Sequence, residues 1–390
     1  MRYRIFIAAL LYAAGLSEAT GQQNPFRLAE KLMLDRDGRL DYVAPWRGLA
    51  TANQQAFDSD TYGPALVTYR SFVGKTTPPA PISSTTPFAL AEGGPLLRAR
   101  ARATRVVLIN EAHDQPAHRA YCRRLLSQLA PLGYTIFAVE ALSPTDTAIN
   151  KRKFPLSSSG FYTREPNMGK LLRAAFTGGF RVFSHEITAA QNKEFKNWRK
   201  SSNYRDSMQA VNVLALLCKN PKAKIVVLVG YDHVLEKEHD GVKRLATYLH
   251  ELGQLDPLTI DQTMAYRPSQ DSPADHPMVL VDRAGRPATI GERQGYVDLQ
   301  IIHPTERLVQ GRPDWLVTGS KALVRALMPP PYAGQPCLAQ LYDRQEYRRY
   351  GEKAIPLDQY LTVARQQGIR LYGLAAGQAV IVRYRPAKLK

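Results

Sequence analysis

The chain has 390 residues and a formal net charge of +18, and 44% of its residues are hydrophobic while 22% are charged. This length and balance predict a folded protein of one large domain or two ordinary ones, and they exclude gross disorder. Basic residues are spread along the chain, and even their densest stretch, residues 344–353, contains two glutamates. We therefore expect a solvated basic surface and no nucleic-acid partner.

Residues 1–21 have the three parts of a secretory signal peptide. Two arginines precede an apolar run at residues 5–16, and small residues follow at positions 17, 19 and 21. Because that run is too short to span a bilayer, we expect an exported protein, periplasmic or secreted, without stable membrane insertion. The chain has three cysteines, Cys122, Cys218 and Cys337. Two of them can form one disulfide after export, but an odd number indicates no disulfide framework.

The mature chain is expected to begin with a helical segment at residues 22–74. A linker rich in Thr, Ser and Pro follows at residues 75–87, where the repeated prolines prevent a regular helix.

Residues 88–270 are predicted to form an α/β core. Apolar runs at residues 105–110, 134–139, 180–183 and 224–229 predict strands, and they alternate with helical patterns at residues 116–129, 167–176, 203–218 and 241–252. Strands that are apolar throughout and alternate with helices predict a mostly parallel sheet with helices on both faces.

Residues 271–390 are expected to form a mixed α/β extension or cap. Strand candidates lie at residues 278–281, 296–302 and 379–384, and a helix candidate lies at residues 357–367. Whether this part extends the sheet or caps it stays open at this point.

Ionisable residues follow all four predicted core strands. In an open parallel sheet, ligands bind at the carboxyl ends of the strands, so these residues should share one edge. They are Glu111 and His113 after the first strand, Glu140 after the second, His185 and Glu186 after the third, and His233 after the fourth. One such residue is commonly a helix cap or a surface group, but four strand ends together favour a site.

Glu111 and His113 are the strongest pair of this set. They are two residues apart, so on extended backbone they point the same way. The carboxylate can orient the imidazole, which can then take a proton from water. His118 and Arg119 open the next helix, and Arg119 is expected to bind an anion or stabilise an oxyanion.

The predicted helix at residues 203–218 carries polar residues on a partly buried stripe. Arg205 and Asn212 share this stripe with Met208, so both should face the protein. Asp206 is predicted to lie in the first turn of the helix, where a carboxylate opposes the helix dipole. An ion pair with a structural role is the ordinary alternative for Arg205.

Residues 105–234 resemble the erythromycin esterase/ChaN-like superfamily, whose wider relatives include the TraB and Tiki-type proteins. Four short motifs carry the resemblance in the expected order: NEAHDQPAHR at residues 110–119, FAVE at 137–140, YRDSMQAVN at 204–212 and VGYDHV at 229–234. Asn110 stands where the family has a glycine, and the spacing is Glu-x-His where the esterases have Glu-x-x-His. No macrolide substrate is therefore predicted.

The resemblance implies a hydrolase that attacks an ester, lactone or amide of a small molecule with water. His113 would act as the general base, with Glu111 orienting it. Glu140, Arg205 and His233 would complete the catalytic set, and the substrate-binding candidates are His118, Arg119, His185, Glu186 and Asn212. No Gly-x-Ser-x-Gly motif is present, so a serine nucleophile is not expected.

Two alternatives remain open. ChaN-like relatives imply binding of haem or iron, which would suit an exported chain with 20 tyrosines. Tiki-type relatives imply a divalent metal ion, for which Glu111, His113 and His233 are the ligand candidates. The spacing of these residues selects no particular metal.

Overall fold

A computed structural model describes residues 24–51, 59–76, 88–263, 266–267, 276–318, 322–332, 334–363 and 368–387. The predicted signal peptide and most of the predicted linker lie outside these ranges. Within them, no helix is both long and apolar enough to cross a membrane. Cys122, Cys218 and Cys337 are all free thiols.

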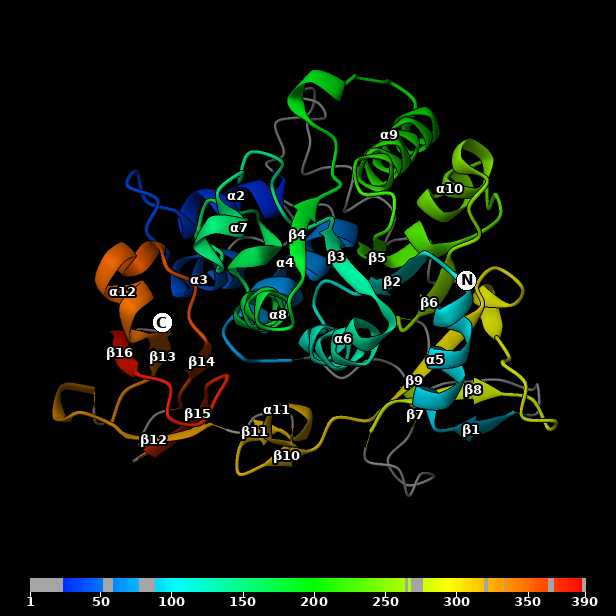
Figure 1. Cartoon of the computed structure of the whole chain (residues 1–390). Helices are drawn as coiled ribbons and strands as arrows, with labels where there is room; N and C mark the ends of the chain where they lie inside the picture. Colours follow the sequence, from blue (N-terminus) through cyan, green and yellow to red (C-terminus); the bar gives the residue numbers. More distant parts are fainter. Residues whose placement is uncertain are drawn as a thin grey trace.

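A mostly parallel sheet forms the centre of the molecule (Figure 1). Among the described residues its strands lie in the order β1-β8-β9-β6-β2-β5-β3-β4, and β7 pairs with β9. The strands are β1 (Ala89–Ala91), β2 (Val106–Glu111), β3 (Tyr134–Val139), β4 (Arg181–Ser184), β5 (Lys224–Gly230), β6 (Leu258–Asp261), β7 (Tyr266–Arg267), β8 (Met278–Val281) and β9 (Leu299–Pro304). Among the described strands of this sheet, the antiparallel pairs are β1 with β8 and β8 with β9, at one edge.

Helices cover both faces of this sheet, as Figure 1 shows. One face packs against α5 (Gly93–Ala103), α6 (Pro116–Leu129) and α8 (Pro166–Thr177). The other face packs against α9 (Trp198–Lys219) and α10 (Leu245–Gly253). Alternate residues of each central strand enter the two cores, so the strands are apolar on both sides.

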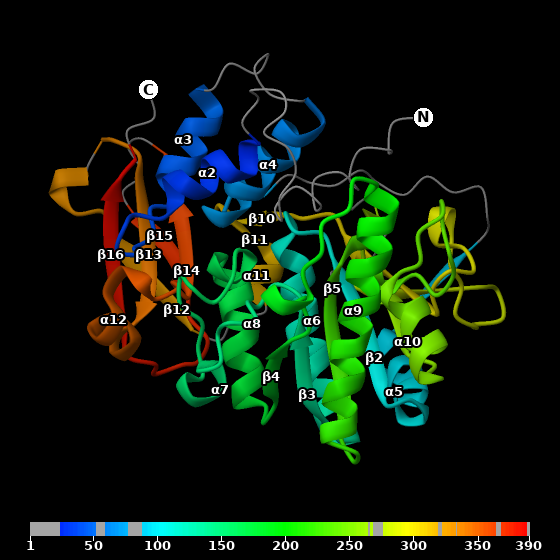
Figure 2. The same cartoon turned by 90° about the horizontal axis from the view of Figure 1, so that it is seen from above.

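The first described helices and the last described strands pack together beside the sheet (Figure 2). The N-terminal helices are α2 (Pro25–Met33), α3 (Val43–Thr51) and α4 (Ser59–Phe72). They share a core with β13 (Cys337–Asp343) and β14 (Asp358–Leu361), and β16 (Val380–Pro386) pairs with β13. A further antiparallel pair joins β12 (Leu323–Leu327) to β15 (Gly368–Tyr372).

The predicted α/β class with a mostly parallel, doubly covered sheet is confirmed. Three expectations are corrected. Residues 358–361 form strand β14 where a helix was predicted, because these residues pair in register with β13. Strand β6 was not predicted, although it pairs with β2 at the centre of the sheet. Helix α9 begins at Trp198 and not at residue 203.

Phe72 offers a test of the packing between the first described helices and the last described strands. Its ring is 1% exposed and contacts Tyr69 and Phe161. We expect Phe72→Ala to lower the free energy of unfolding by about 3–5 kcal/mol, because the truncation leaves a cavity. Urea unfolding followed by circular dichroism measures this change. Leu327→Ala, at a side chain that is 82% exposed, should change it by less than about 0.5 kcal/mol.

Candidate functional site

The carboxyl ends of β2, β3, β4 and β5 lie along one edge of the sheet. These strands are neighbours and run parallel, with Glu111 opposite Gly230 and with Val139 opposite both Leu228 and Ser184. The predicted site residues that follow the strands are therefore brought to the same edge, as parallel pairing requires.

Glu111 is a buried carboxylate that is held by Arg119. The Arg119 guanidinium donates from Nε to Oε2 and from Nη2 to Oε1 of Glu111, both at 2.8 Å. Its Nη1 binds Glu165 at 2.9 Å, and its Nη2 also reaches the His113 carbonyl at 3.0 Å. Burial alone would raise the pKa of Glu111, but Arg119 and His113 lower it below its usual value. Glu111 therefore stays ionised.

His113 lies next to Glu111, with Nδ1 3.4 Å from Glu111 Oε1. Tyr162 stacks on the imidazole at 4.0 Å between ring centroids, and Tyr231 meets it edge-on at 5.1 Å. On the opposite side of the ring, Nε2 is buried and has no hydrogen-bond partner among the described residues. The ring is thus fixed with one nitrogen facing a carboxylate and the other unused.

Gly230 makes room for this ring. A Cβ atom at this position would lie 2.7 Å from Cε1 and 2.8 Å from Nε2 of His113, and 3.5 Å from Oε2 of Glu140. Any side chain at residue 230 would therefore fill the space between His113 and Glu140. The end of β5 is consequently built for close approach of these two groups.

Glu140 joins the two halves of the site. Its Oε2 accepts from the Gly230 amide at 2.6 Å, and its Oε1 accepts from Arg205 at 2.5 Å. Burial would raise the pKa of Glu140, but His233 and Arg205 outweigh burial and hold it well below its usual value. Glu140 is therefore ionised, and the positive charges of Arg205 and His233 stabilise it.

His233 forms a second imidazole–carboxylate pair. Its Nδ1 lies 2.5 Å from Asp206 Oδ1, while its Nε2 lies 3.6 Å from Glu140 Oε1 and 3.4 Å from Arg205 Nη1. Burial opposes the charged ring, but Asp206 and Glu140 raise the pKa of His233 above its ordinary value. The raised pKa means that the His233 ring favours its charged form. In that form Nε2 carries a proton and faces Glu140.

Arg205 and Glu186 form the outer part of the site. Arg205 binds Glu186 through Nε at 3.1 Å and again through Nη2. Their side chains are 19% and 21% exposed, against 8% for Glu140 and 5% for His233. Arg205 therefore bridges Glu140 at the back of the site to Glu186 near the solvent.

Two of the predicted substrate-binding residues, Asn212 and His185, lie at the turn after β4. Asn212 donates to the carbonyls of His185 and Glu186 at 3.2 and 3.1 Å, so it shapes the turn after β4. His185 is fully buried without a hydrogen-bond partner among the described residues, and burial lowers its pKa to about 4. His185 is therefore a neutral side chain that is enclosed in the interior of the protein.

His118 and Arg119 are both fully buried. His118 Nδ1 accepts the Ala112 amide at 3.0 Å and so fixes the turn between β2 and α6. The ring also lies 4.8 Å from that of His303, and burial keeps the pKa of His118 well below its usual value. The structure places both residues under the site, where they orient its backbone and Glu111.

Sequence reasoning missed the roles of four residues, three that contact the two histidines and one, Glu165, that binds Arg119. Asp206 was expected to oppose the dipole in a first helical turn, but it lies inside α9 and faces His233. Tyr162 and Glu165 come from an irregular stretch before α8, where no periodic pattern points to them. Tyr231 follows β5 with a positive φ of 34°, and its hydroxyl accepts the His113 amide at 3.3 Å.

Gly230→Ala tests the close approach at the end of β5. Gly230 has φ −84° and ψ 148°, which alanine also adopts, so any effect comes from the new methyl group. We expect a loss of about 1–3 kcal/mol in the free energy of unfolding, because the packed His113 ring has to shift. The shift is read from the His113 ring resonances by NMR. Gly63→Ala, with no atom within 4 Å of the added Cβ, should leave them unchanged.

Asp206→Asn tests the second imidazole–carboxylate pair through pH. Because the folded pKa of His233 is raised, its contribution to stability is fully present below about pH 6.5 and disappears as pH rises through the raised value. The stability difference between the wild-type protein and Asp206→Asn should therefore be larger at low pH than at high pH. A difference that is constant from about pH 5 to pH 9, measured by urea unfolding, contradicts this.

No protein-family model matches the chain, and no curated protein matches it. Similar solved structures include the type III effector HopBA1, with 14% identity and a TM-score of 0.35 over 57% of this chain and 100% of that one. ChaN of Campylobacter jejuni, from a structure of cofacial heme binding, has 12% identity and a TM-score of 0.34 over 57% and 99%. An open conformation of the erythromycin esterase EreC has 12% identity and a TM-score of 0.16 over 93% and 66%.

Proposed function

We propose that the protein is a hydrolase in which His113 is the general base. The observation that carries this proposal is the arrangement of its imidazole: Nδ1 faces the ionised Glu111, and the buried Nε2 has no hydrogen-bond partner among the described residues. A ring held in this way keeps its proton on Nδ1 and leaves the lone pair of Nε2 to accept a proton. The Nδ1 contact is long at 3.4 Å, as such contacts commonly are before substrate binds.

Glu111 and Arg119 act through His113. Arg119 occupies both oxygens of Glu111, which holds the carboxylate in one orientation beside Nδ1. Neither group is exposed enough to meet a substrate, since the side chains are 2% and 0% exposed. We therefore assign both as positioning residues, and Arg119 is too deeply buried for the anion-binding role that the sequence suggested.

The opposite wall of the site supplies positive charge. In the proposed reaction, water forms a bond to the carbonyl carbon of an ester, lactone or amide while its proton passes to His113 Nε2. The carbonyl oxygen becomes an oxyanion, which Arg205 and the charged His233 would stabilise. Breaking the bond to the leaving group then returns the proton from His113 to that group.

Entry to His113 requires a movement of the side chains around it. Nε2 is buried in the described structure, and the Arg205 side chain, at 19% exposed, is more exposed than those of His113 and His233, at 8% and 5%. Displacement of Arg205 from Glu186 would open a path toward His113 and Glu140. Glu186 would hold Arg205 in the closed arrangement, where it binds the guanidinium twice.

The metal alternative does not fit the donors of this site. Within the described residues, no three His, Cys, Asp or Glu side chains are grouped so that they could hold a metal ion. Arg119 already binds both oxygens of Glu111, and Arg205 contacts both Glu140 and His233, where a cation would have to lie. Repulsion from Arg205 opposes a metal ion at that point.

Haem binding has less support than hydrolysis. The tyrosines nearest the site are Tyr162 and Tyr231, and burial raises the pKa of both phenols above the usual value. Burial thus disfavours the phenolate form that would ligate haem iron. Both rings also pack on His113, which fixes them in their present places.

Replacement of His113 tests the hydrolase proposal. A panel of nitrophenyl and umbelliferyl esters, lactones and anilides identifies an activity of the wild-type protein. We expect His113→Asn to lower kcat for the best substrate by about 100-fold to 10,000-fold, because the general base is removed. His250→Asn, at an exposed position of α10, is the matched control and should keep full activity.

Full turnover by folded His113→Asn would rule out His113 as the base. Equal loss in His250→Asn would show that the effect does not come from the site.

We also propose that the protein acts outside the cytoplasm. The support is the three-part pattern of residues 1–21, with its charged start, apolar run and small-residue exit. N-terminal sequencing of the exported protein should find a start at residue 20 or 22. A mature protein that retains Met1 contradicts the proposal.

A further inference from the structure

The backbone at Gly230 and Tyr231, where β5 ends, is held by side chains from two neighbouring strand ends. Glu140, after β3, accepts the Gly230 amide at 2.6 Å. Asn110, in β2, donates from Nδ2 to the Tyr231 carbonyl at 2.7 Å. Both side chains are buried, which shields these hydrogen bonds from water. The two residues are therefore fixed at an amide on one side and at a carbonyl on the other.

Tyr231 needs such a hold because of its backbone conformation. Its φ is 34°, in a region that residues with a Cβ atom rarely adopt. A residue remains in such a conformation only where the surrounding structure enforces it. The hydrogen bond from Asn110 is a contact of this kind, since it acts on the backbone of Tyr231 itself.

Tyr231 in turn meets His113 at two points. Its ring lies edge-on to the imidazole, at 5.1 Å between centroids, and its hydroxyl accepts the His113 amide at 3.3 Å. A different backbone conformation at Tyr231 would displace both contacts, because that backbone carries the ring and the hydroxyl. The place of the His113 ring therefore depends on Tyr231 as well as on Glu111.

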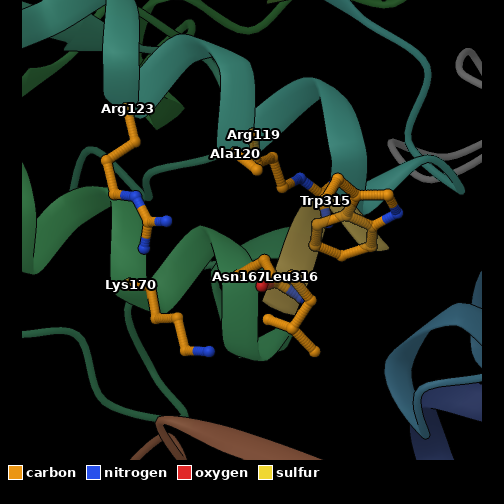
Figure 3. Close-up of a pocket in the computed structure, with 7 residues that line it drawn as sticks. All are labelled: Arg119, Ala120, Arg123, Asn167, Lys170, Trp315 and Leu316. Atoms are coloured by element: carbon orange, nitrogen blue, oxygen red, sulfur yellow. The ribbon is translucent and has the colours of Figure 1, made fainter. Parts of the chain in front are cut away.

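Asn110 and Glu111 are the last two residues of β2, so their side chains enter opposite faces of the sheet. On the Glu111 face, Arg119 binds the carboxylate, and Figure 3 shows the Arg119 side chain beside Trp315 of α11 (Asp314–Thr318). The other face of β2 is left to Asn110. The end of one strand thus reaches His113 from both faces, directly through Glu111 and through Tyr231 from Asn110.

Asn110 is itself anchored at the end of β6. Its Nδ2 also donates to Asp261 Oδ1 at 2.6 Å, and its Oδ1 accepts the Gln262 amide at 2.8 Å. The Gln262 side chain donates to the Asn110 carbonyl at 2.7 Å. Because both the donor and the acceptor of the side-chain amide are engaged, the group cannot turn without breaking several hydrogen bonds. Its bond to Tyr231 is therefore fixed in direction.

We propose that Asn110 is a positioning residue for His113 and that it acts through the backbone of Tyr231. The proposal rests on the proposed function, in which His113 is the general base. Asn110 is fully buried and does not meet the substrate, so its effect reaches the reaction through the place of the imidazole. Glu111 orients the ring at Nδ1, and Asn110 keeps Tyr231 against the same ring.

NMR of the histidine-labelled protein tests this role without reference to turnover. We expect Asn110→Ala to shift the His113 ring resonances, because Tyr231 loses the hydrogen bond that enforces its φ. Thr263→Val is the matched control. It removes a hydroxyl 3.3 Å from Asn110 Nδ2 and leaves the bond to Tyr231 in place, so the His113 resonances should stay as in the wild-type protein.

Kinetics separate this proposal from the proposed function. With an ester that the wild-type protein hydrolyses, Asn110→Ala should lower kcat about tenfold to a hundredfold, because the base is displaced. KM should change little, since no substrate contact is removed. If the wild-type protein hydrolyses none of the substrates, the hydrolase proposal fails, whereas the NMR comparison still decides whether Asn110 positions the His113 ring.

Unchanged His113 resonances in folded Asn110→Ala overturn the proposal, and so does an equal shift in Thr263→Val. Should Asn110→Ala fail to fold, Asn110→Ser takes its place, since the shorter side chain also leaves the Tyr231 carbonyl without its donor. The same shift is expected. A negative φ at Tyr231, measured from backbone couplings of the wild-type protein, overturns the proposal without any variant.

Discussion

The buried ion pair between Arg119 and Glu111 is the interaction on which the candidate site depends. It connects the end of β2 to the first turns of α6, and through Glu165 it reaches the start of α8. Glu165 also caps α8 by accepting the Met168 amide at 2.8 Å, so one arginine joins three elements. Removing one partner would leave an uncompensated buried charge, which costs about 3–5 kcal/mol. The pair therefore fixes the position of the strand end that carries His113.

Around this pair, the site has two histidines in opposite electrostatic settings. His113 faces Glu111 through Nδ1, and Arg119 binds the same carboxylate. His233 lies between Asp206 and Glu140, and these carboxylates raise its pKa. The raised pKa of His233 favours its charged form, which is the form suited to stabilising negative charge in the site. Glu140 and Gly230 keep the two rings near one another without a direct bond between them.

The sequence was sufficient for the parts of the site that come from regular elements. The strands before Glu111, Glu140, His185 and His233 are apolar throughout, because both faces of the sheet are covered. Parallel pairing then places their ends together, so the residues just after each strand were found.

The remaining parts depend on tertiary contacts that leave no periodic signal. Tyr162 and Glu165 lie in an irregular segment, and only packing brings them to His113 and Arg119. Asp206 could not be assigned because its role follows from the rotation of α9, whose true start is Trp198. Strand β14 has only four residues, too few for a clear period of two, and it was mistaken for a helix for that reason. The sequence likewise did not indicate that His118 and Arg119 are fully buried.

The central claim is that Glu111 sets the tautomer of His113. Nitrogen-15 NMR of the histidine-labelled protein, at a pH where the ring is neutral, measures the tautomer directly. The account predicts a proton on Nδ1, toward Glu111, and a bare Nε2 nitrogen that is able to accept a proton. A neutral ring with its proton on Nε2 would contradict the account, since that nitrogen could not then act as the base.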